Sequence, residues 1–229
     1  MITIIFQSIS MYLFYILCTD CQSTRDESIL FDKHVKDRRL LVNCKVPGQP
    51  RPIYRKGELS WDDDLAELAR IQVAACNLSS QYNKKQIEKE YRDTIGINTA
   101  DDANVTNAVN SWFNEYRFYN YKRNTCLKPE DCLHYKRMVW GESEFIGCSV
   151  GRCPQPGIQT GQIVVCYYSP MTSVKDSQPY EEDINNPCPP PQPETTTIIV
   201  PTTKKIVITT ERLKMGPYGR YRCKCTCKP

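Results

Sequence analysis

Thirteen cysteines among 229 residues are the feature that most restricts what this chain can fold into. A chain in the reducing cytosol rarely keeps so many thiols, whereas secreted domains use them to form disulfides. The cysteines therefore predict a domain that folds in an oxidising compartment and is stabilised by disulfides. Their spacing alone does not choose among the possible pairings.

The beginning of the chain agrees with this compartment. Residues 1–17 carry no charge and are mostly apolar, and polar residues follow from Thr19 onward. This apolar run suits the core of a signal peptide, which we place at residues 1–21, and it is shorter than the roughly 20 residues of a membrane span. A retained anchor is the alternative. We therefore predict a secreted, extracellular protein that does not span a membrane, with Asn77 and Asn104 as candidate N-glycosylation sites.

Apolar spacing separates expected helices from expected strands. Leu65, Ala69 and Val73 fall on one helical stripe, which aspartates precede in the first turn, where the helix dipole favours them. Helices are expected on such grounds over residues 27–41, 59–78 and 101–119. Short β-branched and aromatic segments predict strands over residues 134–140, 144–153 and 162–170. Helices followed by antiparallel strands indicate an α+β domain.

The last part of the chain has a different composition. Residues 177–210 are rich in proline and threonine, which predicts an extended linker without a core, similar to an O-glycosylated stalk. Residues 211–229 form a basic, cysteine-rich tail. From Lys204 onward the net charge is +7, whereas the preceding residues carry −3. Such a tail favours binding to polyanions, and a solvated end is the alternative.

Several motifs follow one another in a fixed order. They are Leu59-Ser60-Trp61-Asp62, Trp112-Phe113-Asn114-Glu115, Cys126-x5-Cys132, His134-Tyr135, Met138-Val139-Trp140, Gly147-Cys148-x4-Cys153 and Val165-Cys166-Tyr167-Tyr168-Ser169-Pro170. Together they resemble the CAP superfamily of pathogenesis-related, antigen 5 and helminth venom allergen-like proteins, and a parasitic-worm member above all. The resemblance covers residues 27–176, which we assign as the CAP domain.

The resemblance implies an α-β-α sandwich and three disulfides. The implied pairs are Cys76–Cys153, Cys126–Cys132 and Cys148–Cys166. If the signal peptide ends after Cys21, five cysteines remain outside these three pairs, so one thiol is free or intermolecular. Cleavage after Cys18 would instead leave an even number of cysteines in the mature chain. Cys223, Cys225 and Cys227 are too close to pair easily with each other. We expect them to reach back to Cys44 and Cys188 or to bridge two chains, with a zinc site as the rival interpretation.

The resemblance also implies a central cleft with two histidines and two glutamates that bind a divalent cation. Glu115 and His134 match two of these positions, whereas Ser80 and Ile97 stand at the other two. One imidazole and one carboxylate fall short of the three or four ligands of a typical zinc site. We therefore expect no metal and no other cofactor. His34, in a segment similar to the HNxxR helix motif of the family, is expected to be a helix-face residue.

Two interpretations of Glu115 and His134 compete. As a general base held by a carboxylate, His134 would need a nucleophile, for which Ser111, Ser143 and Ser169 are the nearby candidates. No nucleophile-elbow or HExxH pattern supports such a hydrolase. We favour a hydrogen-bonded pair that braces the cleft, and we expect a protein that is not an enzyme.

Binding is then the remaining class of function. The resemblance implies sterol or fatty-acid binding through aromatic residues ahead of His134. Phe118, Tyr119 and Tyr121 are the candidates for lipid contact, because large exposed aromatic side chains are costly unless they are covered or used. The alternative is an effector that binds a host surface protein or a glycosaminoglycan through the basic tail. We expect no nucleic-acid partner.

Overall fold

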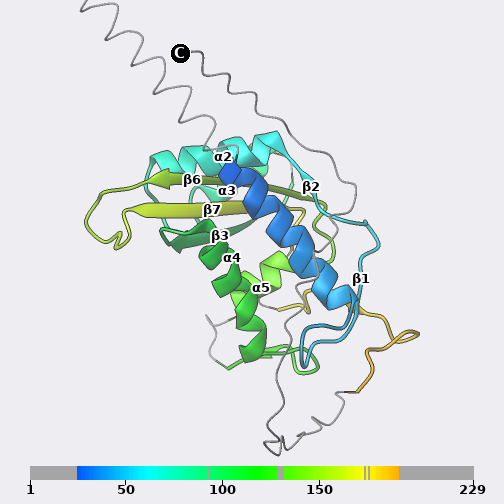
Figure 1. The fold of residues 1–229 in the computed structure, drawn as a ribbon. Coiled ribbons are helices and arrows are strands. Elements are labelled where there is room, and N and C mark those ends of the chain that lie inside the picture. The colour runs from blue at the N-terminus through cyan, green and yellow to red at the C-terminus, as the bar shows by residue number, and fades with distance from the viewer. Residues whose placement is uncertain (1–24, 92, 128–131, 173, 175, 191–229) are drawn as a thin grey trace, which may run out of the picture. The chain divides into compact units, whose positions relative to one another are not determined.

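The computed structural model describes residues 25–91, 93–127, 132–172, 174 and 176–190 (Figure 1). The predicted signal peptide and the basic tail with Cys223, Cys225 and Cys227 lie outside the described residues. Within them, no helix has both the length and the apolar character needed to cross a membrane.

The centre of the fold is a four-stranded sheet in the order β2-β6-β7-β3. Its strands are β2 (Ser60–Trp61), β6 (Phe145–Arg152), β7 (Gln162–Ser169) and β3 (Gly96–Asp101). β7 pairs with β6 and β3 antiparallel, and β2 pairs with β6 parallel. Cys148 lies directly opposite Cys166 in the register, and the two form a disulfide across the centre of the sheet.

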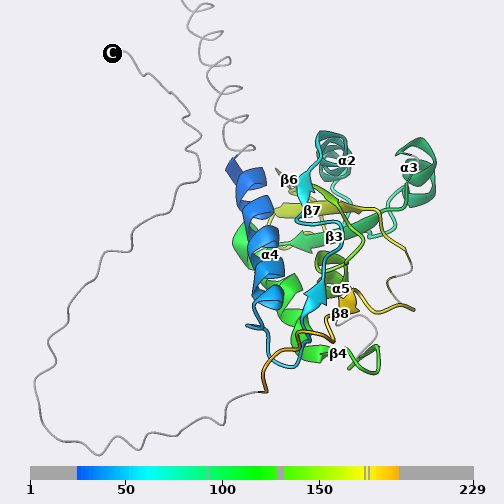
Figure 2. The same ribbon diagram turned by 90° about the vertical axis from the view of Figure 1, so that its right-hand side faces the viewer.

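Helices cover both faces of this sheet, so the fold is the expected α-β-α sandwich (Figure 2). One face carries α2 (Asp63–Ala74) and α3 (Lys84–Tyr91). The other face carries a first helix over residues 25–42, α4 (Val105–Asn114), the 3-10 helix η1 (Glu115–Phe118) and α5 (Leu133–Met138). α3 and β3 have no counterpart among the elements that the sequence pattern predicts.

Strand alternation divides the core into two clusters, because successive side chains of a strand point to opposite faces. Tyr167 and Ile97 belong to the α2-side cluster, with Leu65 of α2 and Ile87 of α3. Tyr168 belongs to the α4-side cluster, which also contains Trp112, Tyr135 and Met138. Neighbouring residues of β3 and β7 therefore serve different layers.

Gly147 of β6 sets how closely α2 lies on the sheet. A Cβ atom built at this position would stand 2.1 Å from the backbone nitrogen of Ala66 and 2.5 Å from the carbonyl carbon of Leu65. Backbone atoms of a packed helix cannot move away cheaply, so only glycine allows this contact. In the Gly-Cys motif of the sequence, the glycine thus allows α2 to pack closely on the sheet, and the cysteine forms the disulfide with Cys166.

Two helices end at a cysteine with a left-handed backbone. Cys44, after the first helix, has φ 56°, and Cys76, after α2, has φ 49°. The N–H groups of Cys44 and Lys45 donate to the carbonyls of Leu41 and Leu40, which is the Schellman arrangement that normally favours glycine. Each helix therefore stops abruptly and places a disulfide-bonded cysteine at its end.

The described residues contain four disulfides. Three join the pairs that the resemblance implies: Cys76–Cys153, Cys126–Cys132 and Cys148–Cys166. The fourth joins Cys44 to Cys188. The prediction that Cys44 and Cys188 pair with cysteines of the basic tail is therefore wrong, because the segment that carries Cys188 lies beside the end of the first helix.

The chain remains attached to the domain past residue 176, beyond the boundary expected from composition. β8 (Glu181–Glu182) pairs antiparallel with β1 (Pro52–Ile53). Tyr180 is buried, and the Gly141 N–H donates to the carbonyl of Pro179 at 2.6 Å. Residues 177–190, assigned to the linker by their prolines, thus form the outer edge of the domain.

Residues 134–138 belong to α5 (Leu133–Met138), and the prediction of a strand over residues 134–140 is wrong. The buried apolar residues Tyr135, Met138 and Val139 have helical spacing, although the segment is too short for this period to dominate its aromatic composition. The decisive contact comes from another element, because the Glu115 carboxylate accepts the N–H groups of His134 and Tyr135 at the start of the helix.

Candidate functional site

Glu115 and His134 form the pair that the sequence analysis places in the cleft. Glu115 is the first residue of η1, directly after α4, and His134 is the second residue of α5. Glu115 Oε1 lies 2.7 Å from His134 Nδ1, and Oε2 accepts the backbone N–H groups of His134 at 2.9 Å and Tyr135 at 3.0 Å. Both carboxylate oxygens are therefore engaged by α5.

This arrangement gives Glu115 a structural role. The first N–H groups of a helix have no partner within the helix, and the positive end of its dipole favours an anion there. The carboxylate supplies both needs, and its second oxygen fixes the orientation of the imidazole. The ring of His134 also stacks on Trp112, with ring centres 6.1 Å apart and planes 19° apart. Its exposed fraction is 29%, against 16% for Glu115.

The other two positions of the implied cleft do not complete a metal site. Ile97 is 1% exposed in the α2-side cluster, whereas the next residue, Asn98, donates through Nδ2 to the carbonyl of His134 at 3.0 Å. Ile97 therefore points to the opposite face of the sheet from His134. Ser80 lies in a turn after α2. A divalent cation at Glu115 and His134 would have to compete with α5 for the carboxylate, so these residues do not fit a metal centre.

In one further group of possible metal ligands, every ligand atom is already bonded to another protein group. Ligand atoms of His34, Cys148 and Cys166 lie within 4.8 Å of one another. The two sulfurs form a disulfide, and both nitrogens of His34 have hydrogen-bond partners. This cluster is therefore part of the core.

His34 joins the first helix to β7. Its Nδ1 lies 2.7 Å from the carbonyl oxygen of Leu30, and its Nε2 lies 2.8 Å from the hydroxyl of Tyr168. Because a carbonyl only accepts, Nδ1 carries the proton and Nε2 accepts from Tyr168. Burial lowers the pKa of His34 to about 4, and the charges of Arg38 and Lys33 act in the same direction. The imidazole is therefore neutral at physiological pH.

Arg38 ties the same helix to the end of α5. Its guanidinium donates to the carbonyls of Met138 at 2.9 Å, Trp140 at 2.6 Å and Ser143 at 3.2 Å, and it lies over the ring of Tyr54. Arg38 is 4% exposed. The segment that resembles the HNxxR motif thus holds α5 and the following turn on the domain.

The three candidate nucleophiles are engaged elsewhere. The hydroxyl of Ser111 donates to the carbonyl of Ala108, that of Ser143 to the carbonyl of Pro170, and that of Ser169 to Asp93. The geometry of the described residues therefore pairs His134 with a carboxylate and brings no activated hydroxyl to it.

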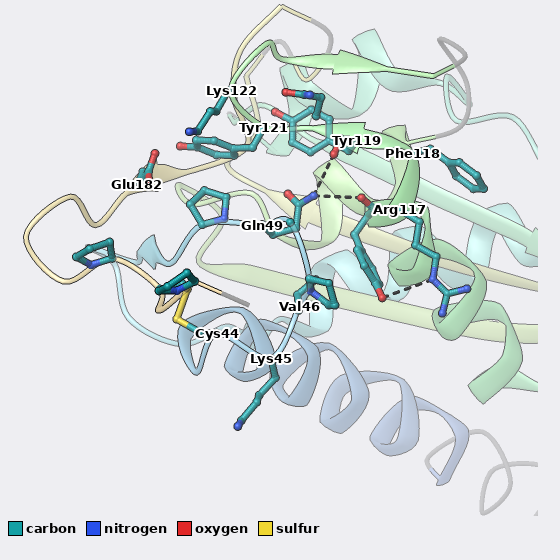
Figure 3. A pocket seen from close by; sticks show the side chains of 18 of the residues that line it. Cys44, Lys45, Val46, Gln49, Arg117, Phe118, Tyr119, Tyr121, Lys122 and Glu182 are labelled. Carbon is teal, nitrogen blue, oxygen red and sulfur yellow. Dashed lines mark hydrogen bonds between the residues drawn. A yellow bond between two sulfur atoms is a disulfide. The ribbon is translucent and has the colours of Figure 1, made fainter. Parts of the chain in front are cut away.

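A wide groove lies at another end of the domain, and we call it the aromatic groove (Figure 3). Its volume is about 980 Å³. Three segments line it: the loop after the first helix, the η1–β4 segment and the C-terminal edge of the domain. Their lining residues are Cys44–Pro50, Tyr116–Lys122, Leu127, Glu182 and Pro187–Pro190. The Cys44–Cys188 disulfide joins the first and third of these walls.

Gln49 fixes the first two walls to each other. Its amide nitrogen donates to the carbonyls of Tyr116 at 3.1 Å and Tyr119 at 3.0 Å, and its amide oxygen accepts from the hydroxyl of Tyr135 at 3.3 Å. Figure 3 shows the side chain between the two walls. Gln49 is 6% exposed, so the groove has a rigid, hydrogen-bonded floor.

The structure divides the three candidates for lipid contact. Tyr119 and Tyr121 are 4% and 5% exposed, and their hydroxyls donate to Asn124 and to the carbonyl of Tyr180. Phe118 is 44% exposed, and its ring turns away from the tyrosines in Figure 3. Phe118 is the last residue of η1, and the chain changes direction into β4 at Tyr119, so the ring of Phe118 and those of the two tyrosines have different surroundings. Tyr119 and Tyr121 are therefore packed into the domain although they border the groove, and the contact of all three residues with lipid stays a prediction.

The groove also contains residues that sequence reasoning missed. Leu127 is 78% exposed, and its N–H donates to the carbonyl of Phe118 at 2.9 Å. β4 (Tyr119–Asn120) pairs with β5 (Thr125–Cys126) and brings Leu127 back beside Phe118. Lys45 stands on the first wall, and Arg117 and Lys122 on the second. No local motif connects these positions, since the chain returns to them from distant segments.

The two candidate glycosylation asparagines hold local turns. The side-chain oxygen of Asn104 accepts the N–H groups of Thr106 and Asn107 at the start of α4. That of Asn77 accepts the N–H of Ser79 at 2.8 Å. Asn104 is exposed and Asn77 is half-buried. Their glycosylation stays a prediction.

Comparison with known proteins matches the chain over residues 50–168 to the family described as "CAP: Cysteine-rich secretory protein family". GLIPR1-like protein 1 of Mus musculus is 34% identical over 135 residues, 56% of each chain. Pathogenesis-related protein 1C of Nicotiana tabacum is 28% identical over 75% of this chain and 90% of its own length. Peptidase inhibitor 16 of Mus musculus is 31% identical, but the match spans only 26% of that protein.

Solved structures show a similar fold. Venom allergen-like protein 4 of Schistosoma mansoni is 31% identical with a TM-score of 0.57, and the match covers 69% of this chain and 94% of that one. BmVAL-1 has a TM-score of 0.51 at 21% identity, over 69% of this chain and 82% of its own, and supports the fold alone.

Proposed function

The chain belongs to the CAP family, and on that premise we propose that it is a secreted, non-enzymatic, venom allergen-like protein that binds a small lipid in the aromatic groove. A sterol and a fatty acid are the two ligand classes considered. The exposed ring of Phe118 at the edge of a groove of about 980 Å³ is the observation that carries the proposal. Pockets of roughly 300–1,000 Å³ take small organic ligands.

The lining of the groove supports an amphipathic ligand. Val46, Pro47 and Leu127 contribute apolar surface, together with the prolines of the C-terminal edge. Lys45, Arg117 and Lys122 supply three cationic groups around it, against one carboxylate from Glu182. An acyl chain on the apolar surface with its carboxylate among these cations matches both features, so a fatty acid fits the charge of the groove better than a neutral sterol.

The hydrogen bonds of the cleft residues argue against catalysis. The Glu115 carboxylate and the Nδ1 atom of His134 are engaged in holding α5, and the three nearby serine hydroxyls have other acceptors. A hydrolase would need one of these groups to move out of a contact that stabilises the fold. We therefore assign the cleft a structural role.

Binding of palmitate and of cholesterol to the purified full chain tests the proposal. Phe118→Ala is expected to weaken binding about ten-fold, because truncation of a buried aromatic contact costs on the order of 1–2 kcal/mol. Ile71→Ala is the matched control, since Ile71 on α2 is 48% exposed and lies outside the groove. Lys122→Ala is expected to weaken palmitate and to leave cholesterol unchanged. Equal binding by wild type and Phe118→Ala would show that the lipid does not bind in the aromatic groove.

A second function rests on the charge of the tail. Residues 204–229 carry +7, the balance expected of a segment that binds glycosaminoglycan or an acidic host protein. Retention on a heparin column should fall when these residues are deleted, while palmitate binding stays unchanged. If the shortened chain elutes at the same salt concentration as the full chain, the tail is not a polyanion site.

A further inference from the structure

We propose that the end of the domain around Phe118 and Leu127 is a docking surface for an anionic phospholipid membrane. This inference goes beyond the binding of a single small lipid, because its partner is the surface of a bilayer. It rests on an exposed apolar pair, on exposed cations around it that have no acidic partner in the described part of the chain, and on the rigidity of the segments that carry both.

The apolar pair is formed by two residues that meet across β4 and β5. Phe118 is 44% exposed and Leu127 is 78% exposed, and a backbone hydrogen bond of 2.9 Å joins them. Side chains of this kind enter the boundary between headgroups and acyl chains when a protein lies on a membrane. Neither side chain belongs to the packed core, so both are available to a partner.

Four exposed cations accompany this pair. Arg117 precedes Phe118, Lys122 and Arg123 follow on the β4–β5 connection, and Lys45 stands on the facing wall of the groove. Within the described residues none of the four forms an ion pair. Anionic lipid headgroups attract such cations, and each basic residue near the surface adds to the attraction.

The other large apolar side chains that are exposed in the described residues follow an acidic residue or a cation that is already in an ion pair. Phe145 follows Glu144, and Ile184 follows Asp183. Ile71 follows Arg70, whose charge is paired with Glu67 and Glu27. Among the residues that the structure describes, only the pair of Phe118 and Leu127 combines large apolar exposure with neighbouring cations that lack an ion pair, so the charge pattern selects this end of the domain for an anionic surface.

The surface is also preformed. Gln49 fixes the η1–β4 segment to the loop that carries Lys45, and the Cys126–Cys132 disulfide holds the residue before Leu127. A rigid surface loses little conformational freedom on binding. The docking geometry is therefore present before the membrane is met.

Co-sedimentation of the full chain with phosphatidylcholine vesicles, with and without phosphatidylserine, tests the proposal. We expect binding only with phosphatidylserine, and binding about ten-fold weaker for the double variant Phe118→Ser, Leu127→Ser. The basic tail is present in every variant, so its own attraction to anionic vesicles does not explain a difference between them. Ile71→Ser is the apolar control, and Lys85→Glu on α3 is the charge control for Lys122→Glu.

Insertion is measured separately through Phe118→Trp. Quenching of the indole introduced at residue 118 by brominated acyl chains is expected on vesicles with phosphatidylserine, relative to the fluorescence of the native tryptophans in the unsubstituted chain. Equal sedimentation of wild type and the Phe118, Leu127 double variant, or sedimentation without quenching, would show that charge alone holds the chain and would overturn the proposal. Palmitate binding below its critical micelle concentration, measured on the same variants, reports the groove independently of the bilayer.

Discussion

Glu115 and Phe118 stand at the two ends of the same four-residue 3-10 helix, η1, but one side chain points into the domain and the other points outward. Glu115 turns inward, and both of its oxygens hold the start of α5. Phe118 turns outward and is 44% exposed beside an open groove. The residue that matches the expected chemistry of the family is occupied by the fold, whereas its neighbour three positions on is free for a ligand.

The comparison extends to the surroundings of each residue. Around Glu115, the buried groups of His34, Arg38 and Asn98 have hydrogen-bond partners within the domain. Around Phe118, exposed cations have no ion pair within the described part of the chain. Buried polar groups with partners stabilise a fold, and exposed apolar and charged groups without partners indicate binding. Substitutions around Glu115 should therefore change stability, whereas substitutions around Phe118 should change binding.

The largest effect on stability is expected at the groove wall. The Cys44–Cys188 disulfide closes a sequence separation of 144 residues. In the chain-entropy model, removal of such a cross-link costs about 5 kcal/mol, an upper figure for Cys44→Ser, Cys188→Ser. Palmitate affinity should also fall, because the first and third walls are no longer joined. Urea unfolding and palmitate titration measure the two effects. Unchanged stability together with unchanged palmitate affinity would show that the disulfide does not shape the groove.

Glu115→Ala should lower the free energy of unfolding by about 3 kcal/mol, because it leaves two helix N–H groups and the His134 ring without their acceptor. Glu115→Gln keeps one acceptor oxygen and should cost less. Palmitate affinity of the folded fraction should stay the same in both variants. A strong loss of affinity in stable Glu115→Gln would instead place the ligand at the cleft.

Acid should destabilise the domain through His34. Its pKa is lowered from 6.5 to about 4 in the fold, so the unfolded chain binds the proton first as the pH falls. The stability is full above pH 6.5 and decreases down to about pH 4, by roughly 3 kcal/mol in total. Unfolding of wild type and His34→Gln at several pH values measures this slope. The same slope in both proteins would show that carboxylates alone cause it.

Zinc should have the smallest effect. Ile97 lies on the far face of the sheet and Glu115 is held by α5, so the chain should bind zinc no better than a surface histidine does. Calorimetric titration of wild type and His134→Ala should give the same weak heats. A stoichiometric, micromolar site that disappears in His134→Ala would show that the cleft remains a metal centre.

The sequence was sufficient for the domain type and for the main layers. α2 and α4 lie where apolar spacing predicts them, and the ordered motifs indicate the α-β-α sandwich that the structure has. The segment 134–140 was mistaken for strands because its helix is short and depends on a carboxylate from η1. That carboxylate caps α5 through a tertiary contact, which the local spacing of apolar residues cannot predict.

The groove shows the same limit more clearly. Its walls come from residues 44–50, 116–122 and 182–190, and no pattern within one of these segments points to the others. Proline content placed residues 177–190 in a linker, although β8 and Cys188 fix this segment to the domain. The aromatic candidates were named from the resemblance and from their place ahead of His134, which does not reveal that Phe118 ends η1 and is exposed, whereas Tyr119 and Tyr121 are buried.

The most direct test of the account is one paired measurement of palmitate affinity on Phe118→Ala and His134→Ala, each corrected for its folded fraction. The two substitutions remove side chains on the two sides of the comparison. We expect about a ten-fold weaker affinity for Phe118→Ala and an unchanged affinity for His134→Ala. The reverse result, with the loss at His134 and none at Phe118, would place the binding site in the cleft and contradict the account.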